Sequence, residues 1–326
     1  MDKLYLGFDT SNYTTSIAVC NENGDVLANL KRLLPVGEGE RGLRQSDAVF
    51  AHIKNIPTLT DELRNLLRRH SEGSEITAAA VSSRPRSVEG SYMPCFLVGV
   101  AVAETVCAAL DIPLYKTSHQ LGHVMAAVNS ACKNSSVPIT SVISAKHLAL
   151  HVSGGTTDLL LVKPDESEVF EAERIGGTND ANAGQIIDRT GVRLGFSFPC
   201  GPYIDRAAIE FGKRVKPGKL SVNGTYFNLS GLENKAQTMM NNGISTEEVS
   251  AFVLSYIAAS IEKILSNAFE IYGKLPVVFA GGVMSSDYIR SIIGHLGYFS
   301  DAEFSSDNAS GCALLASRLH KINSQK

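Results

Sequence analysis

The hydrophobic pattern of the chain repeats one plan at two distant places. Residues 3–19 run from an apolar stretch through a polar turn rich in Thr and Ser into a second apolar stretch, and residues 146–162 do the same around a Gly-Gly turn. Short apolar runs on either side of a polar turn predict a β-hairpin. A further turn follows each copy, NENGD at 21–25 and KPDESE at 163–168. We interpret the repeat as two lobes descended from one duplicated unit, although any two hairpins share some of these features.

The rest of the chain alternates apolar strands with helices, which predicts an α/β fold. We expect strands at 76–82, 112–117 and 275–280, and helices at 95–110, about 246–271 and about 308–322. Thr246 is the expected N-cap of the long helix, ahead of Glu247 and Glu248. Because no low-complexity linker divides the chain, we expect two lobes with a nucleotide and metal cleft between them. The expected lobes are residues 1–115 with 303–326, and residues 116–302.

Composition limits the classes of function. The chain has 326 residues, a hydrophobic content of 44% and a net charge of −3, so RNA binding would need a local basic patch or a partner protein. The six cysteines form no C-x-x-C pair, which favours reduced, packed thiols over disulfides or a zinc ribbon. The polar N-terminus is no signal peptide, and no uninterrupted apolar run has the roughly 18 residues that span a bilayer. We therefore expect a cytoplasmic protein that does not bind a membrane.

Three glycine pairs follow predicted strands: Gly154–Gly155 in a hairpin, Gly176–Gly177 in a loop, and Gly281–Gly282 after LPVVFA. Glycines let backbone N–H groups approach a phosphate, although each pair taken alone is equally a tight turn. No Walker A or G-x-G-x-x-G motif is present, and hairpin phosphate loops suit the actin–hexokinase–Hsp70 architecture. Asp9, at the end of the first strand, either faces phosphates or their metal or stabilises its own turn.

Residues 178–205 are dense in Asp, Asn and Gly. Asp188 lies on a predicted helix that begins at Asp180, and Asp205 is expected to open the next helix, after the turn 199–202. These carboxylates either accept the hydroxyls of a ribose or, in the case of Asp180 and Asp205, cap helices.

His119 and His123 are four residues apart, on one face of a helix that Ser118 could cap. This spacing brings two imidazoles within reach of one divalent ion, although two such histidines also occur as ordinary packing residues. Asp307, before the last helix, is a candidate third ligand. Gln120 stands where an H-E-x-x-H protease has Glu, which argues against a protease of this type.

Seven motifs follow one another along the chain: FDTSNYTTS (8–16), HQLGH (119–123), VSGGTT (152–157), DANAGQIID (180–188), FPCGPYID (198–205), AGGVMSS (280–286) and SSDNAS (305–310). Together they resemble the family of tRNA threonylcarbamoyladenosine transferases, formerly described as O-sialoglycoprotein endopeptidases. The resemblance implies the two-lobed actin-like fold of acetate and sugar kinases, Hsp70 and actin, with a duplicated ribonuclease-H-like core. It also implies transfer of threonylcarbamoyl from threonylcarbamoyl-AMP to the adenosine beside the anticodon of tRNA.

The resemblance implies cofactors, partners and roles for individual residues. It implies a divalent metal, iron or zinc, held by His119, His123 and Asp307, and an adenine nucleotide, threonylcarbamoyl-AMP or one like ATP. Accessory subunits, a scaffold paralogue and an ATPase, are possible partners besides tRNA. Asp9 and Ser153 are the candidate catalytic residues. The predicted nucleotide-binding residues are His151, Val152, Ser153, Gly154, Gly155, Asp188, Gly201, Asp205, Gly281, Gly282 and Ser286.

The chain departs from the family pattern mainly around the nucleotide, which suggests a divergent paralogue. The departures are Tyr13 and Thr14 in place of two acids, Arg84 and Arg86 in a loop that usually carries glycines, Thr156 in place of His, Ala181, Gln185 and Ser286. A paralogue with another acceptor, or a non-catalytic partner, therefore stays open as an alternative. The basic run Lys213, Arg214, Lys216 and Lys219 is a candidate tRNA contact or a solvated loop.

Overall fold

The computed structural model describes residues 2–11, 13–35, 43–69, 73–304 and 309–325. These residues form two compact units. Unit 1 contains residues 1–129, 163–172 and 306–326, and unit 2 contains residues 130–162 and 173–305. Residues 116–129, expected in the second lobe, and the turn at 163–172 thus fall in unit 1.

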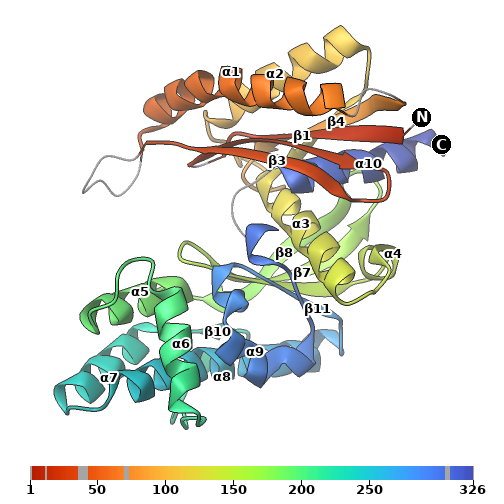
Figure 1. The fold of residues 1–326 in the computed structure, drawn as a ribbon. Coiled ribbons are helices and arrows are strands. Elements are labelled where there is room, and N and C mark those ends of the chain that lie inside the picture. The colour runs from red at the N-terminus through yellow and green to blue at the C-terminus, as the bar shows by residue number, and fades with distance from the viewer. Residues whose placement is uncertain (1, 12, 36–42, 70–72, 305–308, 326) are drawn as a thin grey trace. The chain divides into compact units, whose positions relative to one another are not determined.

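Unit 1 has a mixed five-stranded sheet in the order β3-β2-β1-β4-β5 (Figure 1). Strands β1 to β3 form an antiparallel meander, and β4 and β5 continue the sheet in parallel from β1. The strand bounds are Asp2–Asp9 (β1), Thr14–Asn21 (β2), Val26–Leu33 (β3), Ser74–Arg84 (β4) and Leu114–Ser118 (β5).

Unit 2 repeats this topology in a seven-stranded sheet, β12-β11-β6-β7-β8-β10-β9. Strand β6 takes the place of β1, with β7 and β8 beside it and with β11 and β12 parallel on its other side. The bounds are His147–Val152 (β6), Thr157–Asp165 (β7), Val169–Thr178 (β8), Val222–Asn223 (β9), Tyr226–Phe227 (β10), Val277–Ala280 (β11) and Tyr298–Phe299 (β12). The equal strand order agrees with the duplication inferred from the two hairpins.

The sheet of unit 1 is covered on both faces. Figure 1 shows α1 and α2 on one face and α10 on the other. Their bounds are Gln45–Arg69 (α1), Phe96–Leu110 (α2) and Ser310–Ser324 (α10). Gly7 permits the close approach of α10, since a Cβ there would lie 2.2 Å from the Ala309 carbonyl oxygen. Helix α3 (His119–Asn134) begins in unit 1 directly after β5.

Unit 2 is built around helix α8 (Thr246–Tyr272), most of whose residues are buried. By length and composition the helix could cross a membrane. However, 78% of its most apolar stretch is buried inside the protein, which identifies it as a core helix. The other helices are α4 (Ile139–Ile143), α5 (Ala183–Arg193), α6 (Gly201–Phe211), α7 (Ser230–Asn241) and α9 (Asp287–Ile293), with 3₁₀ turns at Gly282–Ser285, Gly294–Leu296 and Ala302–Phe304.

Several local predictions were wrong in detail. Ser245, not Thr246, caps α8, because its side chain accepts a hydrogen bond from the Glu248 amide. Gly176–Gly177 lies inside β8 rather than in a loop, and a Cβ at Gly177 would meet the Thr157 carbonyl at 2.1 Å. Asp205 does not open α6, which starts four residues earlier at Gly201.

Buried His52 on α1 gives unit 1 a pH-dependent stability. Burial lowers the pKa of this imidazole from 6.5 to about 4, against the opposing effect of the Asp9 charge, and its Nδ1 lies 2.9 Å from the Thr15 hydroxyl. Between pH 6.5 and 4 the unfolded chain binds a proton that the folded chain does not, so stability falls as the pH is lowered. We expect a loss of about 3 kcal/mol over this range. Urea unfolding at several pH values should show a flatter dependence for His52→Gln, and parallel curves would contradict this assignment.

Candidate active site

The two histidines of helix α3 face each other. Ser118 caps the helix, since its hydroxyl accepts a hydrogen bond from the Leu121 amide at 3.3 Å. The Nε2 atoms of His119 and His123 lie 2.9 Å apart. Two nitrogens bound to one zinc ion at the tetrahedral angle lie about 3.3 Å apart, given Zn–N bonds of roughly 2.0–2.1 Å. The convergence of these nitrogens therefore fits a shared divalent ion with little movement.

Asp9 orients the first of these histidines. Its Oδ2 lies 2.7 Å from His119 Nδ1 and accepts a hydrogen bond from Ser82 at 3.1 Å, while Oδ1 accepts one from the Ser11 amide. The residue is buried, with 1% of its surface exposed. A carboxylate on Nδ1 fixes the tautomer in which Nε2 carries the lone pair that can bind a metal. The structure thus places Asp9 behind His119, a position that the sequence analysis did not foresee.

The nearby Cys312 adds no reactive group. Burial and the Asp9 charge raise the pKa of its thiol to about 12, so the sulfur stays protonated next to Ser82. The predicted ligand Asp307 lies outside the described residues. Within the part of the chain that the structure describes, no group of three or more His, Cys, Asp or Glu side chains is arranged to hold a metal.

In unit 2 the hairpin between β6 and β7 forms a loop suited to anions. The Ser153 hydroxyl accepts hydrogen bonds from the amides of Gly155 and Thr156, so this side chain shapes its own loop. Helix α5 begins against the loop, where the Gly184 amide donates to the Ser153 carbonyl at 3.1 Å. Asn182 and Gln185 form a capping box at this helix start.

A cavity of about 610 Å³ adjoins this loop, entirely within unit 2. Seven of the predicted nucleotide-binding residues line it: Ser153, Gly154, Asp188, Gly201, Asp205, Gly282 and Ser286. The first turns of α5, α6 and α9 also contribute, so three helix N-termini meet at one cavity. Positive helix ends at one cavity favour an anionic ligand.

Four predicted nucleotide-binding residues do not line the cavity. Val152 is fully buried in the core, and Gly281 provides a tight turn with φ +101°, where a Cβ would lie 2.0 Å from the Val152 carbonyl oxygen. His151 and Gly155 also lie outside the lining. The buried Val152 and the turn at Gly281 thus shape the backbone beside the cavity.

Most hydrogen bonds to the carboxylates of this region come from backbone amides. Asp205 accepts hydrogen bonds from the Ser286 hydroxyl and from the amides of Asp287 and Tyr288, which start α9. Asp188 accepts one from the Cys200 amide at 2.8 Å. Burial alone would raise the pKa of Asp180, but hydrogen bonds from the α7 start at Leu229 and Ser230 lower it to about 2. Both Asp180 and Asp205 therefore cap helices, which was one of the two roles expected for them. Asp180 caps α7 and not α5, and Asp205 caps α9.

Sequence reasoning missed the apolar wall of the cavity and one hydroxyl. Ile187, Ile209, Leu254 and Val283 line the cavity, and their apolar periodicity could not be distinguished from that of core positions. Ser285 also lines it, and its Oγ is buried with no hydrogen-bond partner among the described residues. A bound ligand could supply that partner.

Two sheets of equal topology, a hairpin loop and a cavity at helix N-termini define the acetate and sugar kinase–Hsp70–actin class of fold. Solved structures agree. Component A of the (R)-2-hydroxyglutaryl-CoA dehydratase of Acidaminococcus fermentans matches with a TM-score of 0.53 and 15% identity, over 98% of this chain and 99% of that one. HypF of T. kodakarensis matches with a TM-score of 0.58 and 11% identity, over 99% of this chain and 48% of that one. At these identities the likeness shows the fold alone.

Comparison of the sequence with known proteins identifies the family of this chain. The model of tRNA N6-adenosine threonylcarbamoyltransferase matches residues 40–313. A relative of that name from Sulfurihydrogenibium sp. strain YO3AOP1 is 30% identical, over 87% of this chain and 80% of the relative. Another from Mycoplasmopsis synoviae strain 53 is 27% identical, over 98% of this chain and all of the relative (100%). The chain belongs to the tRNA N6-adenosine threonylcarbamoyltransferase family, as the seven motifs indicated.

Proposed function

We propose that this chain transfers a threonylcarbamoyl group from threonylcarbamoyl-AMP to N6 of the adenosine beside the anticodon of tRNA. In the reaction a C–N bond forms between the adenosine amine and the carbamoyl carbon, the bond from that carbon to the AMP phosphate breaks, and the amine loses a proton. The family match over residues 40–313 is the observation that carries the proposal. The cavity of unit 2 and the paired histidines of unit 1 supply sites of the right chemistry.

The cavity of unit 2 suits the adenylate part of the donor. The phosphate would lie near the loop at Ser153–Gly154 and the N-termini of α5 and α6, whose helix dipoles favour an anion. The wall of Ile187, Ile209 and Leu254 suits the adenine ring. Asp188 keeps one carboxylate oxygen beyond its bond to the Cys200 amide, and this oxygen can accept from a ribose hydroxyl.

His119 and His123 would hold the divalent metal, and iron and zinc both suit two imidazole ligands. When bound, the ion supplies Lewis-acid polarisation of the carbamoyl oxygen. Asp9 keeps His119 in the tautomer that presents Nε2, and Ser82 and Ser11 hold Asp9 in turn. Asp307 remains the proposed third ligand on the strength of the motif SSDNAS.

One assay tests the reaction. The purified protein is incubated with threonylcarbamoyl-AMP and unmodified tRNA, with and without the accessory scaffold and ATPase proteins, and nucleosides are analysed by mass spectrometry. We expect threonylcarbamoyladenosine in at least one combination, and the arms show whether partners are required. Absence of the modified nucleoside from every arm would overturn the proposal. We expect the activity in the cytoplasm, in keeping with six free cysteines, all of them buried.

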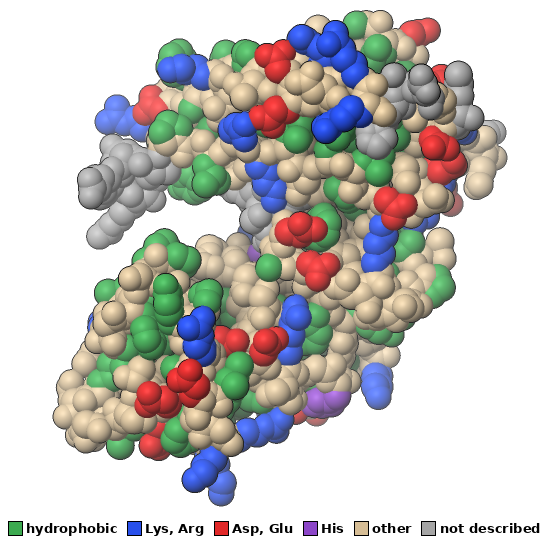
Figure 2. All heavy atoms as spheres, in the orientation of Figure 1, with side chains coloured by type: hydrophobic (Ala, Val, Ile, Leu, Met, Phe, Trp, Pro, Cys, Tyr) green, Lys and Arg blue, Asp and Glu red, His purple; other side chains and the backbone are tan. Residues whose placement is uncertain are grey.

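The basic loop after α6 is the proposed contact for tRNA phosphates. Lys213, Arg214, Lys216 and Lys219 are exposed, and in Figure 2 basic side chains gather beyond the end of α6. The loop is held in place, because Tyr288 donates a hydrogen bond to the Lys213 carbonyl and Arg214 donates to the Ser291 carbonyl.

Changing all four basic residues to Ala should weaken tRNA binding and flatten its dependence on salt, because fewer counterions are released on binding. Filter binding at several salt concentrations measures both quantities. Changing four exposed lysines elsewhere, Lys54, Lys146, Lys263 and Lys274, to Ala removes the same number of charges and is the control for net charge. Equal affinity and an equal salt slope in the loop variant would remove this loop from the interface.

A further inference from the structure

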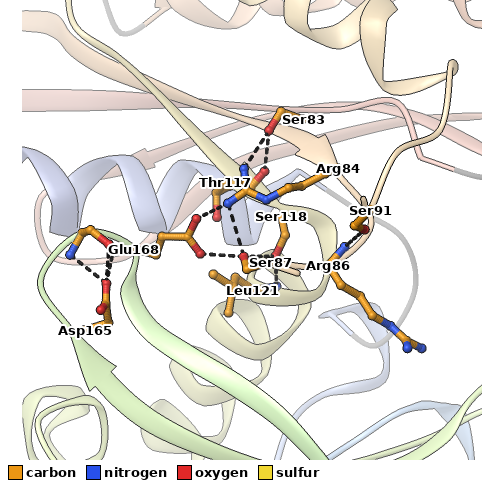
Figure 3. A network of polar contacts seen from close by, with 11 residues as sticks. Ser83, Arg84, Arg86, Ser87, Ser91, Thr117, Ser118, Leu121, Asp165 and Glu168 are labelled. Carbon is orange, nitrogen blue, oxygen red and sulfur yellow. Dashed lines mark hydrogen bonds and ion pairs between the residues drawn. The ribbon is translucent and has the colours of Figure 1, made fainter. Parts of the chain in front are cut away.

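A cluster of four polar side chains lies at the start of helix α3, within unit 1 (Figure 3). We call Arg84, Ser87, Ser118 and Glu168 the Glu168 clamp. The Glu168 carboxylate forms an ion pair with Arg84 and accepts a hydrogen bond from Ser87 at 2.5 Å. The Ser87 hydroxyl also lies 3.1 Å from that of Ser118, the N-cap of α3. Residues from three separate parts of the chain therefore meet at the first turn of this helix.

The clamp can be assigned a consistent set of hydrogens. Ser87 has one hydroxyl proton, which it donates to the Glu168 carboxylate because the acceptor is charged and the contact is short. The Ser118 hydroxyl lies 3.1 Å from the Ser87 hydroxyl, whose oxygen also accepts from Arg84 at 3.4 Å. The Ser118 lone pairs are left to accept the Leu121 amide. Glu168 thus holds the Ser87 hydroxyl against the N-cap hydroxyl of Ser118.

The same loop holds the start of α3 by its backbone. The Gln120 amide donates to the Pro85 carbonyl at 3.0 Å, and the Ser83 hydroxyl donates to the Thr117 carbonyl at 3.1 Å. Each of these contacts lies within three residues of His119. A shift of the loop 83–87 would therefore move the helix turn that carries the first histidine.

Glu168 is itself placed by its turn. Asp165 accepts hydrogen bonds from the Glu168 amide at 2.8 Å and from the amide and hydroxyl of Ser167. This pattern is an Asx turn, which fixes the chain between β7 and β8. The carboxylate is partly shielded, with 22% of the side chain exposed beside an Arg84 side chain at 29%. Shielding of this degree makes the pair stronger than an ordinary surface ion pair.

We propose that Glu168, acting through Ser87 and Ser118, is a positioning residue that sets the first turn of α3 and hence the spacing of the His119 and His123 nitrogens. The inference rests on the proposed function for its metal. It goes beyond that function by assigning a role to a carboxylate that does not itself touch the ion. It also gives Arg84, a departure from the family pattern, a structural use.

The test compares Glu168→Ala and Glu168→Gln with Glu104→Ala in the full-length protein. Glu104 pairs with Lys116 at 2.8 Å across α2 and β5 in the same unit, but both side chains are 52% exposed, so this pair is the matched control. Co²⁺ is titrated as the probe metal, and its visible d–d spectrum reports the geometry of the nitrogen ligands. Hydrogen exchange of residues 118–123 is measured on the metal-free protein, and thermal unfolding monitors the overall fold.

We expect Glu168→Ala to raise the Kd for Co²⁺ about tenfold and to alter the spectrum. Loss of a group that orients metal ligands typically lowers metal affinity by about 10–100-fold, and the expected change is at the lower end of this range. Exchange at 118–123 should rise about fivefold, as for a weakened N-cap. Glu168→Gln should fall between Glu168→Ala and wild type, and Glu104→Ala should match wild type. Equal Kd, spectrum and exchange in Glu168→Ala and wild type would overturn the inference. If wild type binds no Co²⁺, the metal part of the proposed function fails, and the exchange result alone decides whether Glu168 sets this turn.

Discussion

His119→Ala should remove metal binding and stop threonylcarbamoyl transfer. Its Nε2 is one of the two described nitrogens that converge at 2.9 Å, and Asp9 holds the ring by Nδ1 at 2.7 Å. Loss of groups that merely orient ligands costs 10–100-fold in metal affinity, so we expect more than about a 100-fold loss for a ligand itself. Loss of the Lewis acid should lower the transfer rate by at least about 100-fold. Metal content by mass spectrometry and the tRNA assay measure the two effects.

His295→Ala is the control for this substitution, since His295 is an exposed histidine on the 3₁₀ turn Gly294–Leu296 of unit 2. It should leave metal content and transfer unchanged. If His119→Ala kept the wild-type metal content, the two histidines of α3 would be packing residues, the alternative left open by the sequence. If it lost metal but kept full activity, the metal would be structural and the Lewis-acid role would fail.

The sequence predicted best what depends on local pattern. The two hairpins, the helix at 119–123 and its cap at Ser118 follow from spacing within a few residues, and all are present. The choice between adjacent cap residues was harder, because Ser245 and Thr246 both suit an N-cap. Only the geometry of the Glu248 amide distinguishes them.

Partners distant in sequence could not be predicted from spacing. Asp9 contacts His119 across 110 positions, because the parallel strands β1, β4 and β5 bring the end of β1 close to the start of α3. Asp205 caps α9, more than 80 positions away, and no spacing within its motif indicated this partner. Such pairings depend on strand order and helix packing, and a single sequence contains no direct signal of either.

Gly184→Ala should damage the proposed nucleotide site more than any other single methyl group added at the cavity. A Cβ at Gly184 would lie 2.6 Å from the Gly154 nitrogen and 2.8 Å from the Ser153 carbonyl carbon. These are backbone atoms of the loop proposed to hold the phosphate, so the loop or the start of α5 must move. We expect a loss of stability of about 1–3 kcal/mol, as for other overpacked sites. The affinity for AMP, measured by calorimetry, should fall at least about tenfold, because the loop and the helix start that would face the phosphate are displaced.

Gly231→Ala is the matched control. Gly231 is the second residue of α7, as Gly184 is of α5, but a Cβ there meets nothing within 4 Å. In a helix Ala is favoured over Gly by up to about 1 kcal/mol, so this variant should be as stable as wild type or more so and should bind AMP normally. Wild-type AMP affinity in Gly184→Ala would show that the loop at Ser153–Gly154 does not contact the phosphate. If the affinity for AMP falls in Gly184→Ala but not in Gly231→Ala, the nucleotide binds where this loop meets α5.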